Sequence, residues 1–194
     1  MRIISGKFKG ITLFGPIDKK IRPLKDMVRE SIFNFLDHSN KISFNLENSN
    51  ILDLYSGSGS FGLECLSRNS NKVIFIENKN EAIKILEKNV ERLKITNQVK
   101  IFPEDVFLAI QKNSELFFSW LSNANFNLIF CDPPFKNVNI NELVELIAQK
   151  NLLNKNGIII IHRHKKDKVK LKTNFKVVDE RIYGLSKIIF GKII

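Results

Sequence analysis

From residue 50 onward, short apolar runs alternate with stretches of helical periodicity. In the intervening stretches apolar residues recur every three or four positions, as at Ile83, Leu86 and Val90. The apolar runs cover residues 50–54, 72–77, 99–102, 126–132 and 157–162. Runs with few polar interruptions, separated by helices, are typical of parallel strands buried on both faces. The pattern therefore predicts an α/β fold in which helices cover a mostly parallel sheet.

Both ends of the chain add elements to this core. Near the start, two glycines enclose a basic and aromatic triplet, Lys7, Phe8 and Lys9, which predicts the tip of a β-hairpin. Residues 21–36 follow with apolar residues at helical spacing, which predicts an amphipathic helix. The tail over 175–194 predicts two strands joined at "YGLS", so we expect seven strands ending in an antiparallel hairpin. The basic stretch 162–174 is expected to be a connection.

The size of the chain limits the number of domains. With 194 residues and 43% hydrophobic composition, it can bury one ordinary core. We expect one domain over 1–194, with an N-terminal extension over 1–48 and a core over 49–194. Both cysteines lie in apolar contexts, and no apolar run approaches about 18 residues. We therefore expect a cytoplasmic monomer that is independent of membranes.

The positive charge is unevenly placed. The net charge is +11, yet residues 51–161 carry twelve basic and twelve acidic side chains. Residues 1–50 carry nine basic and five acidic side chains, and residues 162–194 carry ten basic and three acidic ones. A coding bias toward lysine could add basic residues, but it would not spare the central segment. The two flanks therefore favour binding to nucleic acid, with Lys7, Phe8 and Lys9 as candidate contacts.

Glycines and acids follow the first three predicted strands. In an open parallel sheet, ligands bind beyond the carboxyl ends of the strands. There the chain places Asp53, then Gly57 and Gly59 in a G-x-G-x-x-G spacing that opens a helix. Glu77 follows the second strand, where a carboxylate can accept two ribose hydroxyls, and Asp105 follows the third, where it can meet a purine edge. The pattern predicts a nucleoside-containing cofactor.

Asp53 discriminates between two such cofactors. A dinucleotide needs the helix N-terminus for its pyrophosphate, where another carboxylate is unfavourable. S-adenosylmethionine has no phosphate and carries sulfonium and ammonium cations, which a carboxylate attracts. We therefore favour S-adenosylmethionine over NAD.

The fourth apolar run ends in Asp132, Pro133, Pro134 and Phe135. An exocyclic amino group on a base is a weak nucleophile, because its lone pair is delocalised into the ring. A carboxylate such as Asp132 can accept a hydrogen bond from that amino group as a methyl group arrives. The prolines stiffen the turn and aim a main-chain carbonyl at the same amino group, while Phe135 offers a flat face to an unstacked base. We predict these four residues to be catalytic.

The chain resembles the bacterial family of 16S ribosomal RNA guanine-N2 methyltransferases, the RsmD family. The resemblance rests on "MRIISGKFKG", "IRPLKDMVRESIFNFL", "ILDLYSGSGSFGLECLSR", "FIENKNEA", "LIFCDPPF" and the closing "ERIYG". It implies a Rossmann-like class I methyltransferase whose partner is the 16S rRNA of the small ribosomal subunit. The implied cofactor-binding residues are Asp53, Tyr55, Gly57, Gly59, Glu77, Asp105 and Arg22. The segment from Arg22 to Asn34 would close over the site, with Arg29 and Glu30 organising it and Arg29 also a candidate nucleic-acid contact.

This sequence departs from the family at two places. Leu24 and Lys25 replace two hydroxyl residues after "RP", and His162 stands where the family tends to have an acid. Histidines and cysteines lack the spacing of metal ligands, so no metal is expected. Two alternatives remain open: an adenine-N6 or cytosine-N4 amino methyltransferase acting on DNA or RNA, and a non-catalytic RNA-binding factor in ribosome assembly.

Overall fold

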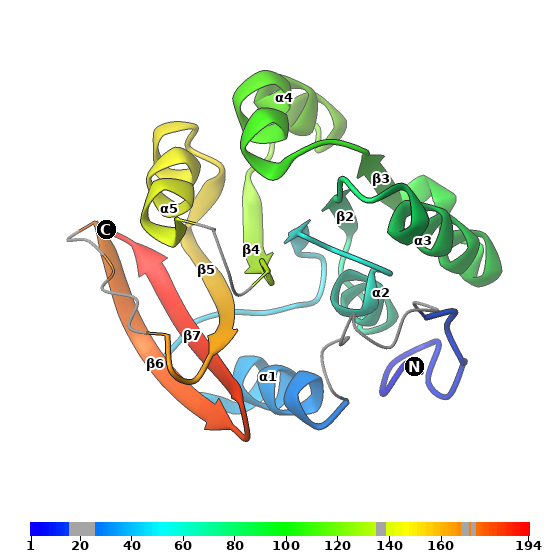
Figure 1. Ribbon diagram of the computed structural model, residues 1–194, viewed down its shortest axis with the longest axis horizontal. Coiled ribbons are helices and arrows are strands. Elements are labelled where there is room, and N and C mark those ends of the chain that lie inside the picture. The colour runs from blue at the N-terminus through cyan, green and yellow to red at the C-terminus, as the bar shows by residue number, and fades with distance from the viewer. Residues whose placement is uncertain (16–25, 135–138, 168–170, 172–173) are drawn as a thin grey trace.

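The computed structural model describes residues 1–15, 26–134, 139–167, 171 and 174–194. Within them, helices and strands alternate along most of the chain (Figure 1). The helices are α1 (Asp26–His38), α2 (Ser60–Ser67), α3 (Asn80–Leu93), α4 (Val106–Trp120) and α5 (Ile140–Gln149), with a 3-10 turn, η1 (Thr96–Gln98). The strands are β1 (Asn50–Leu54), β2 (Lys72–Ile76), β3 (Val99–Phe102), β4 (Phe126–Cys131), β5 (Leu153–His164), β6 (Phe175–Tyr183) and β7 (Ser186–Ile193).

The strands form one seven-stranded sheet in the order β3-β2-β1-β4-β5-β7-β6. The first five strands in this order, from β3 to β5, run parallel to one another. β7 runs antiparallel to both β5 and β6. The predicted seven-stranded, mostly parallel sheet with a C-terminal antiparallel hairpin is confirmed. The order reverses between β1 and β4, which is where an open sheet of this type binds ligands.

Two hydrophobic clusters pack on opposite faces of the sheet. One joins side chains of α1, α2 and α3 to alternate residues of the strands, such as Ile51 and Phe130. The other joins α4 and α5 to the intervening residues, such as Leu52 and Ile129. Figure 1 shows α4 and α5 on one side of the sheet and α1 and α2 on the other. This alternation explains why the strands read as continuous apolar runs.

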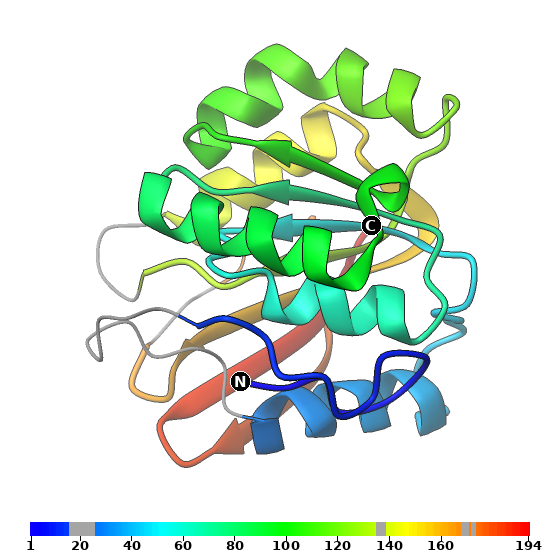
Figure 2. The ribbon, with the colours of Figure 1, turned by 90° about the vertical axis from the view of Figure 1, so that its right-hand side faces the viewer.

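The N-terminal segment shares a cluster with the sheet. Ile3, Leu13 and the buried face of α1 belong to the same cluster as β1 and β4. Phe33 of α1 stacks on Phe61 of α2 at 5.2 Å between ring centroids, and Phe61 stacks on Phe130 at 3.9 Å. Figure 2 shows the first residues of the chain running beside α1 and α2. We propose, on this packing, that residues 1–48 are an extension of the single domain.

Three details differ from the sequence predictions. The N-terminal hairpin has one antiparallel bridge, Arg2 to Thr12, and otherwise consists of turns. Residues 162–164 belong to β5 instead of a connection, because they pair with the start of β7. α4 lies between the third and fourth predicted strands, where the alternating pattern predicts a helix but names none of its residues. Its N-terminal cap, Asp105, is predicted only as a cofactor contact, although a capping acid is also a helix start signal.

Candidate active site

The candidate residues gather at one edge of the sheet because their strands end in register. Leu54 pairs with Ile76 and with Cys131, and Ile76 pairs with Phe102. The residues that follow these strand ends therefore share the carboxyl edge. Tyr55, Glu77, Asp105 and Asp132 all lie within three residues of the end of a strand. The structure thus brings the predicted cofactor residues and the predicted catalytic turn together.

Asp53 is a buried acid in the middle of this edge. Its side chain is 1% exposed, and its Oδ2 accepts a hydrogen bond of 2.9 Å from the N–H of Gly62 in α2. Burial raises the pKa of Asp53 to about 8, the hydrogen bond from Gly62 opposes this, and the charges of Asp132 and Glu77 add to it. The carboxyl of Asp53 therefore favours its protonated form, and a cationic ligand beside it would favour the ionised form.

The glycine loop between β1 and α2 has the geometry of a ligand cradle. Gly57 and Gly59 both adopt positive φ, at 55° and 81°. A Cβ at Gly59 would lie 2.3 Å from Leu86 Cδ1, whereas a Cβ at Gly57 would meet nothing within 4 Å. A side chain at Gly59 would be strained by the positive φ and would require Leu86 to shift, whereas Gly57 presents bare backbone to open space. Such a surface allows a ligand to approach the main chain.

Glu77 links this loop to the end of β2. Its Oε2 accepts a hydrogen bond of 2.8 Å from the N–H of Gly57, and its Oε1 accepts from the N–H groups of Asn78 and Lys79, each at 3.0 Å. Glu77 is 7% exposed. These bonds fix the carboxylate beside Gly57, and its oxygens keep lone pairs that can accept hydroxyl groups.

Asp105 and Tyr55 have local roles besides any ligand contact. Asp105 is the N-cap of α4, where its Oδ1 accepts from the N–H groups of Phe107 and Leu108 at 2.9 and 3.2 Å. Tyr55 is half-buried with a φ of 57°, and burial raises its pKa. Both side chains lie at the carboxyl edge, so both remain proposed cofactor contacts.

The turn after β4 is held by β5 and β7. Oδ1 of Asp132 lies 2.7 Å from Nδ1 of His162, and Nε2 of His162 lies 2.9 Å from Oγ of Ser186. Arg163 donates to the carbonyl of Pro134 at 3.2 Å and pairs with Asp167 at 2.7 Å. The side chain and the backbone of the turn thus both have partners on the neighbouring strand.

Sequence reasoning did not foresee this contact between His162 and Asp132. The sequence identifies His162 only as a departure from the family pattern. The sequence does contain a signal for it: His162 ends the fifth predicted strand. The carboxyl ends of neighbouring parallel strands meet at one edge of the sheet, so His162 is expected beside the end of the fourth strand.

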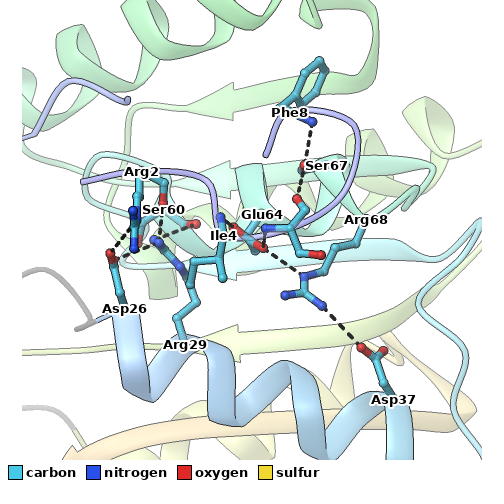
Figure 3. Close-up of polar contacts among 11 residues, drawn as sticks. Arg2, Ile4, Phe8, Asp26, Arg29, Asp37, Ser60, Glu64, Ser67 and Arg68 are labelled. Carbon is cyan, nitrogen blue, oxygen red and sulfur yellow. Dashed lines mark hydrogen bonds and ion pairs between the residues drawn. The ribbon is translucent and has the colours of Figure 1, made fainter. Parts of the chain in front are cut away.

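Arg29 corrects one sequence prediction. It is 0% exposed, so in this structure it cannot contact nucleic acid. Its guanidinium donates to the carbonyls of Arg2 and Ser60 and to Asp26 Oδ1, the last at 3.0 Å (Figure 3). Burial lowers the pKa of Arg29, and the acids Glu64 and Asp26 oppose this effect. The contacts place Arg29 between α1, the N-terminal loop and α2, and its role in organising this segment stays a prediction.

Glu64 docks the N-terminal loop on α2. This fully buried carboxylate accepts from the N–H groups of Ile4 and Ser5 at 2.7 and 2.9 Å and from Nε of Arg68 at 2.9 Å (Figure 3). Ser67, one turn later, accepts from the N–H of Phe8 at 3.0 Å. Sequence reasoning missed Glu64, although an acid inside the apolar run "FGLECL" was the available signal.

The docked loop presents its basic tip to solvent. Lys7 and Lys9 are exposed, while Phe8 is half-buried and packs against the cluster of α1, α2 and α3. Gly6 makes the turn at φ 81°, and a Cβ there would meet the carbonyl oxygen of Ser67 at 1.9 Å. The loop therefore lies directly on α2, whose N-terminus begins at the glycine cradle.

Some predicted residues and chemistries fall outside these observations. Arg22 and Phe135 lie outside the described residues, so their roles remain proposals.

Within the described part of the chain, no group of three or more histidines, cysteines and acids could hold a metal ion. No helix in that same part has the length and apolarity needed to cross a membrane. Cys65 and Cys131 are free and buried, and burial raises the pKa of each thiol.

Sequence comparison finds a family model and named relatives. The model described as "Conserved hypothetical protein 95" matches residues 1–192. Ribosomal RNA small subunit methyltransferase D of Buchnera aphidicola subsp. Baizongia pistaciae is 32% identical over 165 residues, which cover 84% of this chain and 76% of that protein.

Solved structures share the fold over most of the chain. The yhhF protein of Escherichia coli has a TM-score of 0.82 at 24% identity, covering 100% of this chain and 97% of that one. SMU.776, solved in complex with SAH, has a TM-score of 0.60 at 15% identity, covering 86% of this chain and 48% of that one. Together with the strand order, these likenesses confirm the predicted Rossmann-like class I methyltransferase fold. The match over residues 1–192 and the 32% identical relative show that this chain belongs to the family of Conserved hypothetical protein 95, the RsmD family.

Proposed function

We propose that this protein transfers a methyl group from S-adenosylmethionine to the exocyclic N2 amino group of a guanine in 16S ribosomal RNA. The names of its relatives support methylation of small-subunit ribosomal RNA. The observation that carries the proposal is the position of Asp132. It follows the last residue of β4 at the carboxyl edge of the sheet, and its N–H donates to the carbonyl of Leu54 at the end of β1, at 3.3 Å. An acceptor for an amino proton is thus adjacent to the proposed cofactor site.

The residues at the edge suit this cofactor. Glu77 would accept hydrogen bonds from the ribose hydroxyls, beside the open backbone of Gly57. The positive charge of the methionine portion would lower the pKa of Asp53, and the resulting carboxylate would compensate that charge. Gly59, Tyr55, Asp105 and Arg22 would complete the site; Asp105 would use the carboxylate oxygen that does not cap α4.

Methyl transfer requires the amino nitrogen of the base to lie in line with the bond between the methyl group and the sulfur of the donor. When bound, the cofactor supplies an electrophilic methyl group on a positively charged sulfur. Asp132 would accept a hydrogen bond from the guanine N2 group, which localises its lone pair. As the new N–C bond forms, the C–S bond breaks with its electron pair going to sulfur, and the amino group loses one proton. Asp132 would take this proton or pass it to water.

The rest of the turn would hold the base. Pro133 and Pro134 restrict the backbone, and the carbonyl of Pro134 is fixed by Arg163. Phe135 would stack on the base once it leaves its helix, at a cost of about a few kcal/mol that stacking offsets. Positioning of the two reactants would supply much of the rate acceleration.

The N-terminal loop would provide the contact with RNA. Lys7 and Lys9 are exposed on a loop that Glu64 and Ser67 hold against α2. Phosphate contacts by lysine give affinity without reading sequence. We propose a monomer that acts on ribosomal RNA in the cytoplasm, with Phe8 supporting the loop from beneath.

The test is to identify the methylated nucleoside. Purified protein is incubated with labelled S-adenosylmethionine and with either an unmethylated 16S rRNA transcript or small subunits assembled on that transcript. The RNA is then digested to nucleosides and analysed by mass spectrometry. We expect N2-methylguanosine with the wild type, a loss of at least about a hundredfold with Asp132→Ala, and full activity with Glu115→Ala, an exposed acid on α4.

Each alternative function gives a distinct result. N6-methyladenosine or N4-methylcytidine would replace the guanine proposal with an adenine or cytosine methyltransferase. Binding of 16S rRNA without any methyl transfer, equal in the wild type and Asp132→Ala, would indicate a non-catalytic assembly factor.

A further inference from the structure

His162 connects the proposed catalytic acid to a third strand. β5 pairs in parallel with β4, which places the end of β5 beside the turn that follows Cys131. β7 pairs antiparallel with β5, and Ser186 begins that strand. As a result the imidazole of His162 lies between Asp132, at 2.7 Å, and the hydroxyl of Ser186, at 2.9 Å.

The geometry of the three groups constrains the hydrogen bond between His162 and Asp132. An ionised carboxylate can only accept, so Nδ1 of His162 would carry a proton and donate it to Oδ1 of Asp132. The hydroxyl of Ser186 can either donate to Nε2 of a neutral imidazole or accept from Nε2 of a charged one. The side chain of His162 is 9% exposed and that of Asp132 is 27% exposed. The buried imidazole of His162 thus binds the carboxylate of Asp132 on the side that faces the protein interior.

We propose that His162 is a positioning residue: it holds Oδ1 of Asp132 so that Oδ2 meets the amino group of the base. This inference rests on the proposed function, since it assigns a partner to the same carboxylate. A carboxyl group on a turn can rotate about its side-chain bonds, and each wrong rotamer removes the acceptor from the reacting amine. A base oriented by a third group is the usual solution to this problem.

The neighbouring residue supports the same turn through its backbone. Arg163 donates to the carbonyl of Pro134 and is itself held by Asp167. Consecutive residues of β5 therefore fix both the side chain and the main chain of the turn. His162 stands where the family tends to have an acid, so this arrangement distinguishes the present chain from that pattern.

Steady-state kinetics with two variants provide the first test. His162→Phe keeps an aromatic ring without an N–H group, and His162→Asn keeps an amide N–H near the position of Nδ1. For methyl transfer to the 16S rRNA substrate, we expect kcat to fall about tenfold to hundredfold in His162→Phe. We expect KM for S-adenosylmethionine and RNA to stay unchanged and His162→Asn to recover much of kcat. His38→Phe, an exposed histidine on α1, is the matched control.

A double-mutant cycle tests whether His162 acts through Asp132. If it does, adding His162→Phe to Asp132→Ala should cause no further loss of kcat, because the carboxylate that it positions is already absent. Losses that multiply would overturn the inference, as would an unchanged kcat in His162→Phe. Thermal unfolding of each variant shows whether any loss merely reflects an unfolded protein.

The imidazole can also be observed without substrate. The chain has three histidines, so ¹⁵N–¹H spectra of the rings can be assigned with single substitutions. We expect His162 to carry a proton on Nδ1 and to change its signal in Asp132→Ala. A neutral ring with its proton on Nε2 alone would overturn the inference.

The failure of the proposed function and the failure of this inference are distinguishable. A wild type that transfers no methyl group refutes the proposed function, and this inference with it. An active wild type whose kcat is unchanged by His162→Phe refutes this inference alone.

Discussion

At the scale of single residues, three acids, of which Asp53 and Glu77 are buried, distinguish the carboxyl edge of the sheet from an ordinary loop region. Asp53, Glu77 and Asp132 come from three neighbouring strands and lie close enough for their charges to interact. Burying carboxylates without a cation costs free energy. The edge is therefore shaped for a positively charged ligand at the expense of stability.

The buried carboxyl of Asp53 makes stability depend on pH. Its pKa is raised from 3.8 to about 8 in the folded protein, so the folded state retains a proton that the unfolded chain releases. The free energy of unfolding should therefore fall as the pH rises from about 4 to about 8. Asp53→Asn keeps an acceptor for Gly62 without the charge.

We expect Asp53→Asn to melt about 5 °C above the wild type at pH 8 and to match it near pH 4. The same variant should bind S-adenosylmethionine at least about tenfold more weakly by calorimetry. Equal melting temperatures at pH 8 would contradict the assigned burial of this charge.

At the scale of elements, α2 joins the cofactor loop to the N-terminal loop. Its first residue follows Gly59, and its second half carries Glu64 and Ser67, which bind the loop over residues 4–8. The helix therefore connects the loop of the proposed cofactor site to the loop of the proposed RNA contact.

Removing the carboxylate of Glu64 should release the N-terminal loop. Glu64→Ala leaves the N–H groups of Ile4 and Ser5 and the guanidinium of Arg68 without their buried partner. We expect the free energy of unfolding to fall by about 3 kcal/mol. Hydrogen exchange should show faster exchange at Ile4 and Ser5, while Glu87→Ala, an exposed acid on α3, should behave like the wild type. Unchanged protection at Ile4 and Ser5 would contradict the docking.

The elements were largely predictable because their periodicity is local. The runs of β1 and β3 and the buried face of α3 follow directly from apolar spacing. The start of β5 did not, since residues 153–156 include three polar side chains before the apolar run begins. Its pairing with β4 through an irregular register at Phe126 is a tertiary effect that apolar spacing does not reveal.

The spacing of apolar residues could not predict contacts between residues that are far apart in the sequence. Asp132 and His162 are 30 positions apart, and Ile4 and Glu64 are 60 apart. Their meeting depends on which strands are neighbours and on how the N-terminal segment packs. The sequence placed Asp53, Glu77 and Asp132 at one edge because a single rule covers all parallel strands, but no such rule pairs Glu64 with a loop.

At the scale of the whole molecule, charge is concentrated in the parts that flank the cofactor-binding core. Residues 1–50 and 162–194 carry the excess of basic side chains, and the segment between them is balanced. The proposed RNA contact at Lys7 and Lys9 belongs to the first of these flanks. Affinity for RNA should therefore depend strongly on salt, whereas binding of the cofactor should not.

The salt dependence of RNA binding tests the N-terminal surface. For the combined change Lys7→Ala and Lys9→Ala, we expect weaker binding of 16S rRNA at low salt. The slope of log K against log salt should decrease by about 1.5 in magnitude, from two lost phosphate contacts. The pair Lys84→Ala and Lys88→Ala, exposed on α3 in the balanced segment, is the control. Equal slopes of log K against log salt for the two double variants would show that Lys7 and Lys9 do not contact the RNA.

The central claim is that the carboxylate of Asp132 meets the N2 amino group of a guanine beside the methyl donor. A crystal structure of the protein with S-adenosylhomocysteine and a guanine-containing fragment of 16S rRNA measures this contact directly. We expect Oδ2 of Asp132 within about 3.2 Å of N2, with Oδ1 still bonded to His162 and the cofactor sulfur on the opposite side of N2. A guanine bound with its N2 group turned away from Asp132, or cofactor bound elsewhere than beside Gly57 and Glu77, would contradict it.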